Sequence, residues 1–276
     1  MEPLQYEQRG YLKEDFRLFH LADDRREDFG YHYHTFHKMI LLLAGRADYA
    51  VEGEHYRLQP GDLVLVGRGT IHRPEVADGD FYERMILYIS PKYLSELGGG
   101  EDMAACFARA QAQFRYVFHT AYGDRIRELF TLLERARIEG GYGGELLQRA
   151  LFAQLMVAVN RTVFSTQGVE ADGGDTKVVA ILQYLNGHLA QPLSIDELAG
   201  RFYISKYHMM RRFRAETGYS IHNYVTEKRL LLAQQLLQSD VPLRTVAEQC
   251  GYQDYSTFSR AYKKQFGCSP SQNQTP

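Results

Sequence analysis

The histidines near the start of the chain are the residues best suited to bind a ligand or a metal. His32 and His34 stand two positions apart, so on a β-strand both imidazoles point to the same face. His37 and Lys38 follow closely, and His72 ends the stretch PGDLVLVGRGTIH. Imidazoles are common metal ligands and also hydrogen-bond polar small molecules. This segment is therefore a candidate binding site.

A second candidate site is a basic helical unit that occurs twice in the C-terminal third of the chain. The stretch MMRRFRAETGYS begins at Met209, and FSRAYKKQFGCS begins forty-nine positions later at Phe258. Two copies of a basic helix at a fixed spacing predict a partner that is itself periodic, and duplex DNA is the obvious candidate. The positions that agree between the copies are Arg211 and Arg260, Phe213 and Tyr262, Gly218 and Gly267, and Ser220 and Ser269.

The charge distribution supports this interpretation. The 276 residues carry a formal charge of −2, but the residues from Thr176 onward hold 12 Lys and Arg against 7 Asp and Glu, a net charge of +5. The preceding 175 residues hold the other 20 and 27, a net charge of −7. A basic segment attracts phosphate groups, whereas an acidic one is repelled by them. The sequence therefore predicts a DNA-binding module attached to a separate acidic domain.

The cysteines and the N-terminus predict a cellular compartment. Cys106, Cys250 and Cys268 are scattered, with no CxxC spacing and no paired framework. The N-terminus lacks a signal-peptide pattern, and the longest apolar run, 39–44, is far too short to span a membrane. We expect a protein of the reducing cytoplasm that is neither exported nor inserted into a membrane.

Short strands are expected to position the histidines. Turn residues such as those of Pro60-Gly61-Asp62 separate short apolar runs, and Pro91 ends the pattern. This spacing is typical of a compact β-barrel or sandwich. The expected strands are 39–43, 47–51, 55–58, 63–66, 70–72 and 84–90.

Helical periodicity follows the strands. Apolar stripes over 124–138 and 145–164, separated by a glycine cluster, predict a helical hairpin. The segment 165–175 has Val169 as its one large apolar residue and is expected to be a flexible linker. The predicted domains are a barrel over 1–95, a helical lid or dimerisation region over 96–165, a linker over 166–175 and a helical domain over 176–276.

Caps and periodicity divide the helical domain into two similar pairs of helices. Ser205 and Asp254 are the expected N-caps of the two basic helices, 206–217 and 255–266, and each helix ends at a glycine. Each basic helix follows a shorter one through a tight turn, which is the layout of a helix-turn-helix. The second turn is one residue longer than the first. The other expected helices are 177–190, one starting at 194, the connector 221–237, and 243–250.

The stretches ISKYHMMRRFRAETGYS and VPLRTVAEQCGYQDYSTFSRAYKKQFGCSPSQ closely resemble the AraC/XylS family of transcription regulators. The resemblance covers about residues 177–274. One departure is the pair Asn273-Gln274, which stands where the family usually has Tyr-Arg and implies the loss of one phosphate contact. The resemblance implies a bacterial regulator whose two recognition helices enter successive major grooves about 34 Å apart.

Helical spacing sorts the residues of the two basic helices. His208, Met209 and Phe213 share the stripe expected to pack inward in the first, as Phe258 and Tyr262 do in the second. The residues expected to face outward are Lys206, Tyr207, Met210 and Arg211, and Tyr255, Ser256, Ser259 and Arg260.

The resemblance implies that most of the outward residues face base edges. Arginine can reach guanine bidentately, while Tyr207 and Met210 offer apolar contact to thymine methyl groups. Alternatives remain: Arg211 and Arg260 can equally contact phosphates, and Met210 can belong to the core. We expect Arg212, Lys263 and Lys264 to contact phosphates or to be solvated, and His208 to be a core histidine.

Residues 16–89 resemble, more loosely, the cupin-like sensor domain common in the same family. Such a barrel brings a histidine at the His72 position opposite His32 and His34. Enzyme cupins bind a metal with three histidines and a carboxylate, but the carboxylate position is Lys38 here, a cation that opposes metal. We therefore predict no metal; His32, His34, Lys38 and His72 are expected to line a pocket for an acidic or polyhydroxylated small molecule. Satisfied histidines in a vestigial barrel are the alternative, and His37, on the opposite face, is expected to be exposed.

The predicted fold is therefore α+β and multidomain, with a cupin-like barrel, a helical hairpin and an all-α domain of two helix-turn-helix motifs. The predicted function is sequence-specific DNA binding, controlled by a small-molecule effector in the barrel, without enzymatic activity, catalytic residues or a cofactor. The expected partners are a double-stranded operator, an unknown effector and a second copy of the chain held by the hairpin, with RNA polymerase as a further candidate. Two alternatives stay open: a metal-dependent cupin enzyme fused to a DNA-binding module, and a constitutive binder whose barrel only dimerises.

Overall fold

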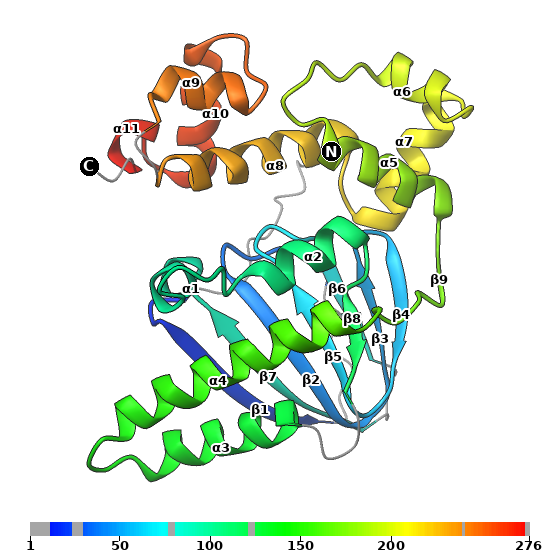
Figure 1. The fold of residues 1–276 in the computed structure, drawn as a ribbon. Helices are drawn as coiled ribbons and strands as arrows, with labels where there is room; N and C mark the ends of the chain where they lie inside the picture. Colours follow the sequence, from blue (N-terminus) through cyan, green and yellow to red (C-terminus); the bar gives the residue numbers. More distant parts are fainter. Residues whose placement is uncertain (1–11, 24–29, 77–80, 121–124, 239–240, 274–276) are drawn as a thin grey trace. The chain divides into compact units, whose positions relative to one another are not determined.

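The computed structural model describes residues 12–23, 30–76, 81–120, 125–238 and 241–273. The chain divides between Gly173 and Gly174 into two compact units, which we call the barrel unit and the helical unit. Strands dominate the barrel unit and helices make up the helical unit (Figure 1). The predicted α+β architecture is confirmed.

Two antiparallel sheets form the barrel. One has the strand order β1-β7-β2-β5-β8, and the other has the order β6-β3-β4-β9. Most of these strands are buried; β5, with the sequence DLVLV, is buried throughout. The strands are β1 (Phe16–Asp23), β2 (His37–Gly45), β3 (Ala47–Val51), β4 (Glu54–Leu58), β5 (Asp62–Val66), β6 (His72–Glu75), β7 (Tyr82–Ile89), β8 (Val117–His119) and β9 (Gly173–Gly174).

Helices cover the five-stranded sheet (Figure 1). The predicted hairpin is present as α3 (Arg125–Glu139) and α4 (Gly144–Ser165); its expected first residue, Asp124, lies outside the described residues. Phe152 of α4 stacks on Phe16 of β1, with the ring centroids 4.4 Å apart, which fixes the hairpin to the sheet. The shorter helices of this unit are α1 (Pro91–Leu97) and α2 (Ala105–Gln113).

The segment predicted to be a flexible linker is instead held against the barrel over much of its length. The half-buried Val169 donates its backbone N–H to the Val117 carbonyl at 2.7 Å. Asp172 accepts the backbone N–H of Arg57 through its carboxylate, also at 2.7 Å, and donates to the carbonyl of His55. The low content of large apolar residues predicted a flexible linker. The bonds that hold the segment use backbone groups and one short acidic side chain, which such a content does not indicate.

The helical unit contains two helix-turn-helix motifs joined by one long helix. In Figure 1, α6 and α7 lie at one end of α8, and α9 and α10 lie at the other. The recognition helices have the predicted bounds, because Ser205 and Asp254 cap their N-termini and left-handed glycines end them. The helices are α5 (Thr176–Gly187), α6 (Ile195–Arg201), α7 (Lys206–Thr217), α8 (Ile221–Leu236), α9 (Leu243–Gln249), α10 (Tyr255–Phe266) and α11 (Pro270–Asn273).

Candidate functional site

The first recognition helix, α7, has one buried and one exposed face. Met209 and Phe213 are fully buried and hold the helix against its own motif. Tyr207 is 73% exposed and Met210 is 42% exposed, and Arg211 is also exposed. Tyr207 and Met210 lie three positions apart on the helix and so adjoin on its surface, and contiguous exposed apolar groups can mark a contact site. The outward face predicted from spacing is therefore present, and Met210 belongs to it and not to the core.

The second recognition helix, α10, repeats this arrangement. Phe258 and Tyr262 are fully buried, and Tyr255 is 37% exposed. The Asn273 side chain, at the departure from the family pattern, donates to the Tyr262 hydroxyl at 2.9 Å, so it has a structural role. Exposed on the other face are Ser256, Arg260, Lys263 and Lys264, with Ser259 half-buried beside them.

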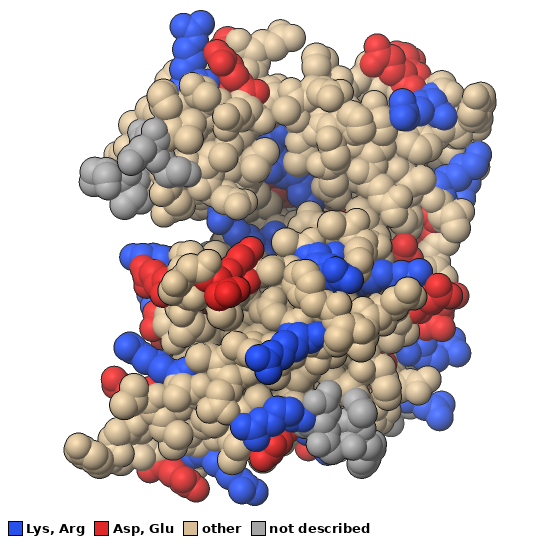
Figure 2. Space-filling view, in the orientation of Figure 1, with Lys and Arg blue, Asp and Glu red and all other residues tan. Residues whose placement is uncertain are grey.

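Three side chains of α7, two cationic and one an imidazole, are not simply solvated. Arg212, predicted to contact phosphate or water, is paired with the carboxylate of Asp175, which also caps α5. Lys206 forms an ion pair with Asp196 of α6 at 2.5 Å. His208, predicted to be a core residue, is only half-buried, because it lies beside the buried stripe and not within it. Figure 2 likewise shows acidic side chains next to basic ones on the face in view.

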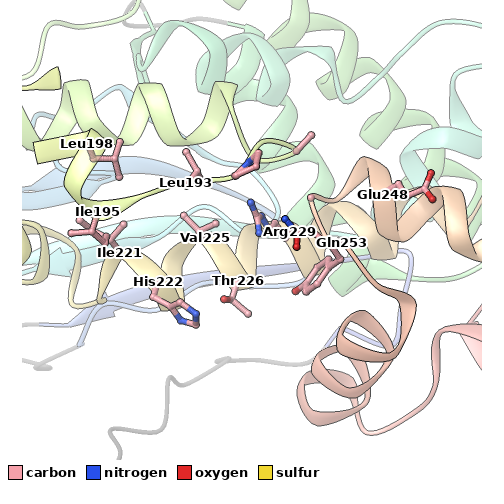
Figure 3. A pocket seen from close by; sticks show the side chains of 14 residues that line it. Leu193, Ile195, Leu198, Ile221, His222, Val225, Thr226, Arg229, Glu248 and Gln253 are labelled. Atoms are coloured by element: carbon pink, nitrogen blue, oxygen red, sulfur yellow. The ribbon is translucent and has the colours of Figure 1, made fainter. Parts of the chain in front are cut away.

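A cleft of about 460 Å³ separates the two motifs within the helical unit. Figure 3 shows Leu193 and Ile195 on one side, Val225 on the connector helix, and Arg229 beside them. Arg229 donates from Nε to the Leu189 carbonyl at 2.8 Å and from Nη2 to the Gln191 carbonyl at 2.7 Å.

We call the hydrogen bonds from Arg229 to the Leu189 and Gln191 carbonyls the Arg229 tie. Gly251, in the turn of the second motif, lies directly against it. A Cβ at this position would be 2.5 Å from the Leu189 carbonyl oxygen and 2.9 Å from the Arg229 guanidinium carbon. Arg229 also lies over the Tyr252 ring, with 6.0 Å between its guanidinium carbon and the ring centroid. One side chain thus joins the two motifs, a role that the sequence alone did not indicate.

In the barrel unit, the three predicted histidines converge. His32, His34 and His72 are all buried, and their ligand atoms lie within 4.8 Å of one another. His32 donates from Nδ1 to the Gly30 carbonyl at 2.8 Å, and His72 donates from Nδ1 to the Thr70 carbonyl at 3.0 Å. Because a carbonyl only accepts, Nδ1 carries the hydrogen in both rings, and in the neutral rings Nε2 presents a lone pair.

Lys38 lies beside this cluster and is only 7% exposed. Its ammonium is 5.9 Å from the centroid of the Tyr88 ring, which in turn is 5.8 Å from the His34 ring. Burial and the nearby charge of Arg84 lower the pKa of Lys38 to about 7. Burial and the charge of Lys38 lower the pKa of His72 well below its usual value, so His72 is neutral at pH 7. The structure therefore brings together all four side chains predicted to bind a ligand.

His37 lies on the opposite face of β2, as expected from its position, but it is not exposed. Its ring stacks on Phe107 of α2, with the centroids 4.4 Å apart, and its Nδ1 accepts the Arg68 backbone N–H at 3.2 Å. Burial and the charge of Arg68 lower its pKa to about 3. The prediction was wrong because the sequence did not show that α2 covers this face of the strand.

The three histidines have the number and burial of a metal centre, but their surroundings do not suit one. Metal-bound histidines commonly donate their other nitrogen to a carbonyl, as His32 and His72 do. However, burial and the charge of Lys38 lower the pKa of His72, and no carboxylate of the described residues acts to raise it. Arg84, buried to the same extent as Lys38, adds a second cation on the same face. A divalent cation would meet two like charges in a region of low dielectric.

Two further side chains of this site escaped sequence reasoning. Tyr49 is fully buried, stacks on His72 with 6.0 Å between the ring centroids, and its hydroxyl has no hydrogen-bond partner in the described part of the chain. Arg84 donates to the Tyr82 carbonyl at 3.0 Å. Both lie on strands, where alternation predicts a buried face but does not single out one tyrosine or arginine.

These features define a class of protein, a transcription regulator that joins a ligand-binding barrel to a helix-turn-helix DNA-binding domain. The model of the AraC-like ligand binding domain matches residues 18–156, and that of a helix-turn-helix domain matches residues 198–275. The chain belongs to the AraC family of transcription regulators.

Related transcription regulators match over most of their length. The HTH-type transcriptional activator RhaS of Escherichia fergusonii is 26% identical over 243 residues, which cover 87% of this chain and 85% of that protein. RhaS of Klebsiella pneumoniae is 24% identical, covering 87% of this chain and 85% of that protein.

Solved structures are also similar to parts of the chain. The DNA-binding domain of AdpA, solved in complex with a target DNA, is 30% identical and covers 34% of this chain and 86% of that one, with a TM-score of 0.34. ToxT from Vibrio cholerae O395 is 13% identical and covers 95% of this chain and 99% of that one, with a TM-score of 0.38. In the described part of this chain, no helix is long and apolar enough to cross a membrane.

Proposed function

We propose that α7 and α10 bind successive major grooves of one operator and read its sequence there, under the control of an effector bound in the barrel. The observation that carries this proposal is the exposed face that each recognition helix keeps opposite its buried stripe. Arg211 on α7 and Arg260 on α10 occupy equivalent positions on these faces, and an exposed tyrosine, Tyr207 or Tyr255, lies in the first turn of each helix. Exposed arginines at such positions can read guanine, and the neighbouring aromatic and apolar groups can contact thymine methyls.

The exposed lysines of α10 have a different role from Arg211 and Arg260. Lys263 and Lys264 lie in the last turn of the helix, away from the N-terminal residues that recognition helices commonly direct at base edges. We expect these lysines to contact phosphates, which contributes affinity for any DNA sequence and a dependence on salt. Arg212 is not included, because its guanidinium is paired with Asp175.

Two matched variants test this division of contacts. Arg211→Ala should weaken binding to a selected operator by about 1–3 kcal/mol and relax the preference at one base pair. Lys264→Ala should weaken binding to selected and random DNA alike, and flatten the dependence of affinity on salt. Gel-shift titrations of both variants against both DNAs measure this, and equal losses on the two DNAs for both variants would refute the division.

We also propose that the chain dimerises through the tip of the α3–α4 hairpin. Ile138 and Leu146 are each 73% exposed there, Leu147 is 51% exposed, and Tyr142 is fully exposed. Further along, α4 buries an apolar stripe within the barrel unit, whereas at the tip several large apolar side chains stay exposed together and could contact a second copy. A two-fold dimer would place the same patch of each copy against its counterpart.

Leu146→Glu should raise the dimer dissociation constant at least tenfold, because it places a charge in an apolar contact. Ser165→Glu, which adds the same charge at the opposite, exposed end of α4, is the control. Analytical ultracentrifugation of the full chain measures the constant for both. Unchanged dimerisation in Leu146→Glu would rule out the tip as the interface.

A cytoplasmic location and contact with RNA polymerase complete the proposal. RhaS is named as a transcriptional activator, and activation by a DNA-bound regulator commonly proceeds through the polymerase. In-vitro transcription from a promoter carrying the selected operator tests this part. A rise in transcript on addition of the protein supports it, and a fall identifies a repressor.

A further inference from the structure

The interior of the barrel contains the buried ammonium of Lys38, which no acidic group of the described residues balances. In the antiparallel register of β2 with β7, Lys38 pairs with Tyr88 and Leu42 pairs with Arg84, so the side chains of all four point to the same face. That face is opposite to the one carrying His37 and α2, and it faces the histidine cluster. Lys38 and Arg84 are each only 7% exposed. Burying an ammonium without a counter-charge is strongly unfavourable.

The buried carboxylates of the described residues are engaged elsewhere. Glu52 accepts the backbone N–H of Ile71 at 3.1 Å. Asp62 accepts from the backbone N–H of Gln59 at 2.8 Å and is paired with His119 at 2.9 Å. Among the described residues, none places a carboxylate within ion-pair distance of Lys38. Within the described ranges Lys38 therefore has no counter-charge, and a bound anion would supply one.

Two polar atoms near the histidine cluster lack hydrogen-bond partners among the described residues. His72 Nε2 and the Tyr49 hydroxyl are buried and have no hydrogen-bond partner within the described ranges. The Nδ1 hydrogen of His72 is already donated to Thr70, so its Nε2 can only accept a hydrogen bond. A hydroxyl group can donate to Nε2, whereas a carboxylate cannot. The Tyr49 hydroxyl can donate to an oxygen and accept from a hydroxyl.

We propose that the effector is a hydroxylated carboxylic acid of the sugar-acid type. Its carboxylate would lie against the Lys38 ammonium, and its hydroxyl groups would donate to His72 Nε2 and bond the Tyr49 hydroxyl. This inference rests on the proposed function, because it assumes that the barrel is the effector site. A neutral sugar would satisfy the polar atoms and leave the charge unbalanced. A metal would satisfy the lone pairs and add to the charge.

The test compares acids with their neutral parents on the full chain. Thermal shift and isothermal titration would use D-glucuronate against D-glucose and D-galacturonate against D-galactose, with D-gluconate as a further acid and Co²⁺ as the metal. We expect at least one acid to raise the melting temperature and its neutral parent to bind at least tenfold more weakly. Ligands that bind only the folded state produce such a shift.

Three variants connect the binding to the site. Lys38→Met should weaken binding of the acid at least tenfold and raise the melting temperature of the ligand-free protein, because it removes an unbalanced buried charge. Lys92→Met, at an exposed lysine, is the control and should change neither. Tyr49→Phe removes a single oxygen, so it tests the site even if Lys38→Met fails to fold, and it should weaken the acid several-fold.

Three results would overturn the proposal: equal binding of an acid and its neutral parent, no shift with any of the acids at millimolar concentration, or stoichiometric Co²⁺ binding that His72→Ala abolishes. Operator binding by the same protein preparation is measured in parallel. If that binding is intact while the acids fail, the proposed effector class is wrong and the proposed DNA-binding function stands. If operator binding is absent, the proposed function itself is wrong.

Discussion

Replacing Gly251 by alanine should disturb the junction between the two helix-turn-helix motifs more than any exposed substitution nearby. Gly251 has a φ of +78°, a conformation that costs other residues about 1–2 kcal/mol. The added Cβ would also lie 2.5 Å from the Leu189 carbonyl oxygen, a backbone atom that cannot rotate away. Overpacking of this kind typically costs about 1–3 kcal/mol. The total is about 2–5 kcal/mol.

Gly267 provides a matched control for the backbone term. It ends α10 with a φ of +76°, and nothing lies within 4 Å of the Cβ that an alanine would add. Gly267→Ala should therefore lose only the conformational term of about 1–2 kcal/mol. The difference between the two variants isolates the contact with Leu189 and Arg229, and it should be about 1–3 kcal/mol.

Hydrogen exchange of the full chain measures this difference locally. Amides of α9 that exchange through opening of the second motif should exchange about ten- to a hundredfold faster in Gly251→Ala than in Gly267→Ala. Because the two motifs share this junction, Gly251→Ala should also weaken operator binding more than Gly267→Ala does. Equal exchange in the two variants would show that the Arg229 tie does not hold the motifs together.

Two further predictions concern pH and helix capping. The Lys38 pKa of about 7 should be raised by a bound carboxylate, so affinity for the best-binding sugar acid is full below pH 7 and falls as pH rises above 7, by at most tenfold per unit. The groups facing Lys38 are Arg84, Tyr88 and the histidine cluster, in which burial lowers the pKa of His72 well below its usual value. Calorimetry of wild type and Lys38→Met between pH 6 and 9 should show the fall only in the wild type. Ser205 caps α7 by accepting the His208 N–H, so Ser205→Ala should cost about 1 kcal/mol and speed exchange in the first turn of α7, whereas unchanged exchange would contradict the capping role.

The helical unit could be predicted closely from sequence because its signals are local. Capping side chains, terminal glycines and a 3.6-residue stripe lie within one helix, so the bounds of α7 and α10 follow from residues that touch each other. The buried stripe of α10, Phe258 and Tyr262, follows in the same way. The predicted burial of His208 was wrong, because helical spacing does not decide whether a residue beside the buried stripe is itself buried.

The features that sequence did not reveal depend on contacts between distant segments. His37 is covered by a helix about seventy positions later, and Arg212 is neutralised by Asp175 from before α5. The role of Arg229 depends on carbonyls forty positions away, which carry no side-chain signal. The histidine cluster was anticipated through the family resemblance, since nothing local joins His72 to His32.

Both recognition helices are expected to engage one operator together. Hydroxyl-radical footprinting on an operator selected from random DNA tests it most directly, in the full chain and in Arg211→Ala. We predict two protected patches about one helical turn apart on the same face of the duplex, with the patch bound by α7 weakened in the variant. A single patch, or protection that Arg211→Ala leaves unchanged at both positions, would contradict the account.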